Sequence, residues 1–516
     1  MLKRLLSLMF VVVLVLVMGS CSGKNTKSGS SGSESDVSAS NESDNTPGET
    51  SGGASDSDIP GESTGGSSGS SGGGNGTSSG KPPSTTQPGG SSNVELAGTV
   101  NVQSGTSSLD QSLNFGGKSF TMAITEEPQY STNAFKRMVA AFESKYNCKI
   151  KLVQLVFNTY NQQMTQAMSS GTPYDIAFSH GSMFPSNVIS GLAADMGSVI
   201  TTADYMSESN PSAGGIDIYK SSYFSWNGKL YGLCTFSADS VYPYLIYYNK
   251  QLFKNNGLDD PMDLYNSGKW SWNMIRTMGR QVTDTSKNLY FLSSSFVSYG
   301  SYYSYGTPFV TMKNGTFTEN LSSQNVMTSL NMMQNFFASS LPIGTETDNG
   351  AQLKYDKFYD GSRFMFLEES MKYPMIADNV VKSQAFGRSK NNLGIVPVPL
   401  DSANKDKAYP TGWMFATYAG KGSSDPRAAA AWVKFRQTYK DPVTDANAMS
   451  ADQSALVNKL LSGKIIFPHG VFATSSYTTL ALNSEIHYFA YKKVDLASSI
   501  ANIRPKYQEA IRATIS

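Results

Sequence analysis

The segment that most constrains the fold lies between residues 224 and 250, where two extended apolar stretches are separated by a short break of small, mostly polar residues. A polar turn at Asn227-Gly228 precedes the first stretch, and this dipeptide is typical of a chain reversal. The two stretches are residues 230–236 and 241–248, and both are rich in aromatic residues. Such a pair of strands predicts a chain that leaves one sheet and enters another.

Upstream of this segment, strand and helix patterns alternate. Residues 119–124, 149–156 and 176–178 are short apolar runs that predict strands. Between them, apolar residues recur at helical spacing, first from Phe135 to Tyr146, with Thr132 or Asn133 as the helix cap. Alternation with short loops predicts an α/β fold with mostly parallel, doubly wound sheets.

The N-terminal residues have the pattern of an export signal. Two basic residues precede about 13 mostly apolar residues, which are too few to span a membrane but suit a signal peptide. The small residues before Cys21 resemble a bacterial lipobox. We therefore expect a lipoprotein signal peptide at residues 1–20 and an acylated Cys21 that anchors the protein at the extracellular face of the cell membrane. An ordinary cleaved signal with an incidental cysteine is the alternative.

Residues 21–117 are dominated by Gly, Ser, Thr, Asn and Pro and contain almost no large apolar residue. Such a segment buries too little surface to offset the entropy lost on ordering. We predict a disordered Gly/Ser-rich linker over 21–117, with order beginning near Lys118.

Composition argues against several functional classes. The net charge of +1 and pI near 7.6 predict no nucleic-acid partner. The three histidines are far apart and no HExxH or CxxC spacing occurs, so we expect neither a metal site nor a cofactor. Cys148 and Cys234 could pair in an exported protein, but nothing in the sequence brings them together, and two isolated buried thiols are the interpretation that we favour.

Several motifs together resemble the family 1 extracellular solute-binding proteins, the sugar receptors of bacterial ABC importers. Residues 227–233 and 247–253 match the "dGKlYGlp" and "lyYNkdlF" segments of that family. Further matches, in the order of the family, occur at residues 169–176, 191–195, 393–399 and 409–414. The resemblance covers about residues 118–440.

The resemblance implies a two-lobed, periplasmic-binding-protein-like fold in which each lobe is a mostly parallel sheet flanked by helices, and hinge strands join the lobes. The expected lobes are residues 118–238 with 363–437, and 239–362 with 438–516. It also implies a monomeric, non-enzymatic receptor that captures a carbohydrate, with an oligosaccharide as the favoured ligand, by hinge closure. The implied partners are this ligand and the permease subunits of an ABC transporter.

Candidate ligand-binding residues come from three sources. Ligands of open α/β sheets bind outside the carboxyl ends of the strands, which indicates Glu126, Glu127, Ser179 and His180. A glycine-rich stretch at residues 298–306 could expose aromatic rings that stack on sugar faces. Its tyrosines are Tyr302, Tyr303 and Tyr305. The remaining candidates are Asp239 and Tyr244 on the crossing segment, and Glu368, Glu369 and Trp413 on segments that would return to the first lobe.

Each candidate also has a purely structural interpretation. His180 could be a loop imidazole bonded to the backbone, the 298–306 stretch could be a structural hairpin, and Asp175 is expected to brace its turn. Trp413 is the candidate that we rank first, because many sugar receptors of the family place an aromatic residue in the cleft at this motif.

Two other functions remain open from the sequence. A surface glycoside hydrolase or lyase needs a pair of carboxylates, which Glu126-Glu127 or Glu368-Glu369 could supply, but neighbouring residues of an extended segment point to opposite faces. The same fold could also bind a polyamine or another small solute, with aromatic and acidic residues holding the cation.

Overall fold

The computed structural model describes most of the chain after residue 97. The residues that it describes are 98, 100–107, 109, 112–125, 128–156, 159–204, 215–235, 240–297, 299–303, 306–313, 315–338, 341–344, 350–399, 411–443, 445–461, 482, 485–489, 491–492 and 494–515. The signal peptide, Cys21 and most of the linker lie outside these ranges, as do Glu126, Glu127, Asp239 and Tyr305.

Several residues before Lys118, where the sequence predicts order to begin, are part of the core. Leu109, Leu113 and Phe115 are buried in an apolar cluster with the first helix, and Val100 and Val102 pack against it. The predicted linker boundary at Gly117 is therefore too late. The few apolar residues in this Gly/Ser-rich stretch bury enough surface to hold it on the domain.

The first part of the chain forms the predicted alternation of strands and helices. Strands β1 (Ser119–Thr125) and β2 (Lys149–Leu155) are parallel, in the register Ser119 with Lys149. Helix α2 (Asn133–Tyr146) connects them, and its cap is Thr132, whose side chain accepts from the Phe135 amide. Helix α3 (Tyr160–Ser169) then leads to β3 (Ala177–His180). Just before β3, the Ile176 carbonyl accepts a hydrogen bond from the Ala123 amide, which links this segment to β1.

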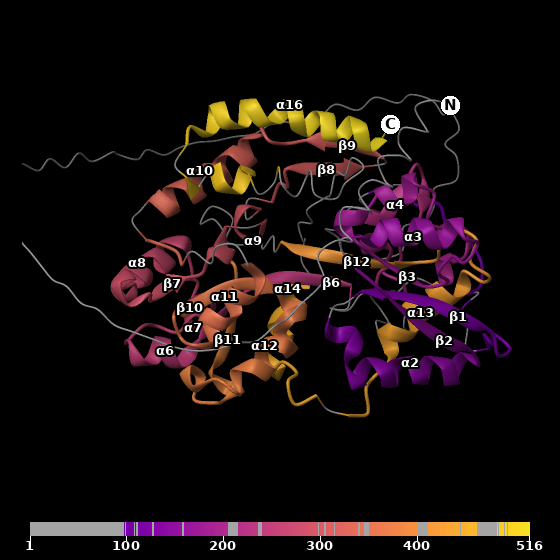
Figure 1. Cartoon of the computed structure of the whole chain (residues 1–516), viewed down its shortest axis with the longest axis horizontal. Coiled ribbons are helices and arrows are strands. Elements are labelled where there is room, and N and C mark those ends of the chain that lie inside the picture. Colours follow the sequence, from indigo (N-terminus) through magenta and orange to yellow (C-terminus); the bar gives the residue numbers. More distant parts are fainter. Residues whose placement is uncertain are drawn as a thin grey trace, which may run out of the picture. The chain divides into compact units, whose positions relative to one another are not determined.

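The largest sheet has the strand order β3-β12-β6-β10-β7, and β11 also pairs with β6 (Figure 1). Its strands are β6 (Val241–Asn249), β7 (Tyr290–Leu292), β10 (Arg363–Glu369), β11 (Leu393–Pro397) and β12 (Gly412–Tyr418). Pairing is parallel between β10 and β7 and antiparallel at β6 and β12. The large sheet is thus mixed, because β10 and β7 are parallel and its other strand pairs are antiparallel.

The expected boundary at residue 363 is not seen in the strand pairing. Strand β10 pairs with β6 and β7, and β11 pairs with β6, so both stay with the second half of the chain. Strand β12 pairs with β3 of the first part of the chain. Two small hairpins complete the strands, β4 (Ser225–Trp226) with β5 (Lys229–Leu230), and β8 (Val310–Lys313) with β9 (Thr316–Glu319).

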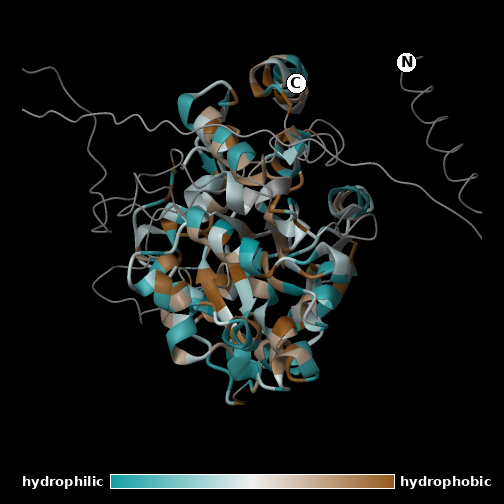
Figure 2. Cartoon of the chain, turned by 90° about the vertical axis from the view of Figure 1, so that its left-hand side faces the viewer, coloured by the Kyte–Doolittle hydropathy of each residue, from teal (hydrophilic) through white to brown (hydrophobic). Residues whose placement is uncertain are grey.

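The remaining helices lie along the described part of the chain from residue 186 to residue 515. They are α4 (Ser186–Ile189), α5 (Ile218–Ser221), α6 (Lys250–Asn255), α7 (Pro261–Asn266), α8 (Trp272–Val282), α9 (Tyr299–Tyr302), α10 (Gln324–Ala338), α11 (Gly350–Tyr359), α12 (Tyr373–Val380), α13 (Arg427–Thr438), α14 (Ala451–Leu461) and α16 (Leu496–Ile515). Many show both hydrophilic and hydrophobic residues along their length (Figure 2), as amphipathic packing requires. Among the described residues, no helix has the length and apolar character needed to cross a membrane.

Candidate functional site

Strand β12 is the element that joins the two halves of the large sheet. Its first residues pair with β6, in the register Trp413 with Tyr242. Its later residues pair with β3, in the register Phe415 with His180. One short strand therefore carries the sheet from the second half of the chain to the first (Figure 1).

Strand register gathers a set of side chains on one face of the sheet at this junction. Residues directly opposite each other, and residues two apart in a strand, share a face. Glu369 of β10 lies opposite Tyr244 of β6, which extends the set to a fourth strand. We call this set the crossing face, and its members are His180, Tyr242, Tyr244, Glu369, Trp413 and Phe415.

The rings of the crossing face contact one another. The His180 ring lies 4.5 Å from the Trp413 ring and 4.8 Å from the Phe415 ring, between centroids. Tyr242 meets Phe415 edge-on at 5.3 Å. The indole N–H of Trp413 donates to the Tyr244 hydroxyl at 2.8 Å. These contacts fix the ring orientations, so the face is preorganised.

The crossing face is partly open to solvent. Trp413 is 7% exposed, whereas His180, Tyr242, Tyr244, Glu369 and Phe415 are half-buried. Desolvation among the neighbouring rings lowers the pKa of His180 to about 3, so its imidazole is neutral at physiological pH. The face therefore presents aromatic rings, a neutral imidazole and one carboxyl group, a combination suited to stacking and to accepting hydrogen bonds.

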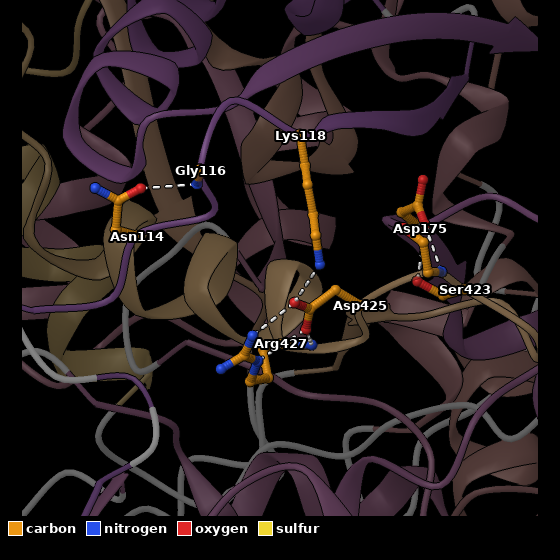
Figure 3. A network of polar contacts seen from close by, with 8 residues as sticks. Asn114, Gly116, Lys118, Asp175, Ser423, Asp425 and Arg427 are labelled. Atoms are coloured by element: carbon orange, nitrogen blue, oxygen red, sulfur yellow. Dashed lines mark hydrogen bonds and ion pairs between the residues drawn. The ribbon is translucent and has the colours of Figure 1, made fainter.

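A polar brace holds the loop that follows β12. The Asp175 carboxylate accepts from the Thr121 amide at 2.9 Å, the Ser423 hydroxyl at 2.8 Å and the Ser424 amide at 3.1 Å. Beside it, Asp425 pairs with both Lys118 and Arg427 (Figure 3). The predicted bracing role of Asp175 is confirmed. These bonds tie the exit of β12 to β1 and so help to fix the position of the crossing face.

The two adjacent glutamates of β10 have different environments. Glu368 is 6% exposed and bonds the Lys354 ammonium at 2.5 Å and the Tyr355 hydroxyl at 2.6 Å. Burial alone would raise the pKa of Glu368, but the Lys354 charge and these hydrogen bonds outweigh it and lower the pKa. The Glu369 side chain lies on the other face of the strand, and Glu369 pairs with Tyr244 of β6. Only Glu369 belongs to the crossing face, and Glu368 is engaged in an internal ion pair.

In the glycine-rich stretch, the described residues 299–303 do not expose the aromatic rings that would stack on a sugar. Its residues 299–302 are helix α9, and Tyr302 and Tyr303 are each 1% exposed. The Tyr302 hydroxyl donates to the His487 carbonyl at 2.6 Å, and its ring stacks on the His487 ring. Both tyrosines are core residues here, so we leave them out of the candidate site.

The structure thus brings together His180, Tyr244, Glu369 and Trp413 from the predicted set. Ser179 lies in β3, with its backbone opposite Ala416. Tyr242 and Phe415 were not predicted, although each is two residues from a predicted aromatic in the same strand, and this period-two spacing could have revealed them. Cys148 and Cys234 are free and buried, which confirms two isolated thiols.

Comparisons with known proteins agree with this architecture. The family model described as bacterial extracellular solute-binding protein matches residues 129–440. No curated protein matches the sequence. An ABC substrate-binding protein of Listeria monocytogenes, solved in complex with cycloalternan, superposes with a TM-score of 0.57 at 17% identity, over 77% of this chain and 99% of that one.

Two further solved structures are similar. An extracellular solute-binding protein from Staphylococcus aureus, in complex with maltose, has a TM-score of 0.54 at 14% identity, over 76% of this chain and 98% of that one. The galacto-N-biose/lacto-N-biose I-binding protein of a Bifidobacterium longum ABC transporter, in complex with lacto-N-biose, has a TM-score of 0.54 at 14% identity, over 78% and 98%. The two-lobed, periplasmic-binding-protein-like α/β fold predicted from the sequence is confirmed. The chain belongs to the family of bacterial extracellular solute-binding proteins.

Proposed function

We propose that this protein captures an oligosaccharide on the crossing face and delivers it to an ABC transporter. The observation that carries the proposal is the preorganised set of rings around Trp413, next to the Glu369 carboxyl group, at the junction of the two halves. Sugar C–H faces pack on aromatic rings, and a carboxylate accepts from two hydroxyls at once. The similar structures solved with cycloalternan, maltose and lacto-N-biose support the same ligand class.

The junction also suggests how closure would work. We place one lobe at residues 118–235 with β12 and α13, and the other at 240–399 with the C-terminal helices. Strand β12 then pairs with strands of both lobes, and β6 enters the second lobe directly after the segment 236–239. A ligand that contacts both lobes would favour the closed state, because the open state lacks part of these contacts.

An oligosaccharide ligand should raise the melting temperature of the protein. At about 100 times its dissociation constant, a ligand adds about 2.7 kcal/mol to the free energy of unfolding. Thermal shift assays with a panel of α- and β-linked oligosaccharides, and with spermidine as a cationic alternative, test this. A shift with spermidine and none with any saccharide would contradict the sugar and indicate a polyamine ligand. A carboxyl group among aromatic rings can also hold such a cation.

We also propose that the receptor is tethered through an acylated Cys21, which lies outside the described residues. The support is the signal-like N-terminus before Cys21. Two acyl chains hold a protein stably on a membrane. The Cys21→Ser variant is therefore expected in the culture medium, whereas the wild-type protein stays with the membrane fraction. Equal membrane retention of both would contradict the anchor.

A further inference from the structure

A cavity lies between helices α8 and α10. Its volume is about 430 Å³, which is within the range of small-molecule sites. Its lining residues all come from these two helices, and none belongs to the crossing face. The first turn of α8 supplies one wall and residues 328–336 of α10 supply the other.

Two aromatic side chains form the apolar part of the lining. Trp272 is 7% exposed and Phe336 is 5% exposed, and their rings meet edge-on at 5.1 Å between centroids. The Trp272 indole N–H is buried and has no hydrogen-bond partner among the described residues. An unsatisfied buried donor is costly, and because this nitrogen is buried, the two rings offer a ligand only their exposed apolar parts.

The polar part of the lining is made of amides and one cation. Asn331 and Asn335 are one turn apart on α10, and Asn273 faces them from α8. Arg276, the charged residue of this lining, donates to the Asn273 side-chain oxygen. Among the residues that the structure describes, no carboxylate lines the cavity, and the positive end of the α8 dipole lies at the same wall. The electrostatics therefore favour an anionic group.

We propose that this cavity binds a carboxylate-bearing sugar, such as a uronic acid unit, at a site separate from the crossing face. The planar guanidinium of Arg276 matches a carboxylate in a bidentate pair. The three amides can donate to and accept from sugar hydroxyls, and the exposed parts of the two rings can pack on C–H groups. A neutral sugar would use the amides and leave the guanidinium without an anionic partner.

Titration calorimetry on the full chain tests this site with three probes: galacturonic acid, digalacturonate and the methyl ester of digalacturonate. Digalacturonate is expected to bind at least about tenfold more tightly than its ester, because the ester cannot accept a charge-assisted pair. Galacturonic acid shows whether a single unit is enough. Arg276→Gln should remove most of the preference for the acid over the ester.

Arg280→Gln is the matched control, since Arg280 lies one turn further along α8, is exposed, and does not line the cavity. It should leave digalacturonate binding unchanged, and Arg276→Gln should leave any thermal shift by neutral oligosaccharides unchanged. The second result separates this site from the crossing face. Equal binding of acid and ester, equal losses in the two variants, or no binding of digalacturonate in the millimolar range would overturn the proposal.

Discussion

Replacing Trp413 by alanine is expected to weaken oligosaccharide binding by about a hundredfold, because a central aromatic anchor is worth about 2–4 kcal/mol. Trp413 contacts His180 with its ring and Tyr244 with its indole N–H. Its removal takes away a stacking surface and also releases two neighbouring rings from their fixed orientations. Calorimetric titration with the best ligand of the oligosaccharide panel measures the loss.

The same substitution should lower stability, because Trp413 is 7% exposed and truncation of a buried tryptophan costs about 3–5 kcal/mol. Trp270→Ala is a matched control. Trp270 is 8% exposed, and its indole N–H donates to the Pro397 carbonyl at 2.8 Å, the same distance as in Trp413. Trp270 lies outside the crossing face. At a temperature where both variants are folded, only Trp413→Ala should lose affinity, and equal losses would assign Trp413 to the core alone.

Local sequence patterns predicted the elements well, because the forces that set them act between near neighbours. The cap at Thr132 follows from a hydroxyl that accepts from the amide of Phe135, three residues along the chain. The helical spacing from Phe135 to Tyr146 is present as α2. The opposite orientations of Glu368 and Glu369 follow from the period of two in a strand, although only the strand pairing shows which of them reaches the crossing face.

Features that depend on distant partners were not predictable. The burial of Tyr302 depends on a hydrogen bond and a stacked ring from His487, 185 residues away. The pairing of β12 with both β6 and β3 depends on strands that are distant in the sequence, and apolar runs carry no information on pairing partners. Likewise, Leu109 and Phe115 appear isolated in the sequence, and only the packed cluster shows that they are core residues.

Acid is expected to destabilise the protein through two desolvated histidines well before most carboxylates titrate. Burial lowers the pKa of both His180 and His487 to about 3, against about 6.5 in an unfolded chain. Above pH 6.5 both states hold neutral imidazoles and the effect is absent. As the pH falls from 6.5 towards 3, the unfolded chain takes up a proton that the folded protein does not, so the free energy of unfolding decreases.

At pH 5 this loss should be about 2 kcal/mol for each histidine. Urea unfolding at pH 7.5 and pH 5 measures it, and His180→Phe, which keeps a ring beside Trp413 and Phe415, should remove about half of the histidine contribution. His487→Phe is the matched variant in the core, where it should remove the other half without altering ligand affinity. If His180→Phe lost as much stability between the two pH values as the wild-type protein, the imidazole would have to be protonated on the folded crossing face, and a positive charge would then stand among the rings that we propose bind the sugar.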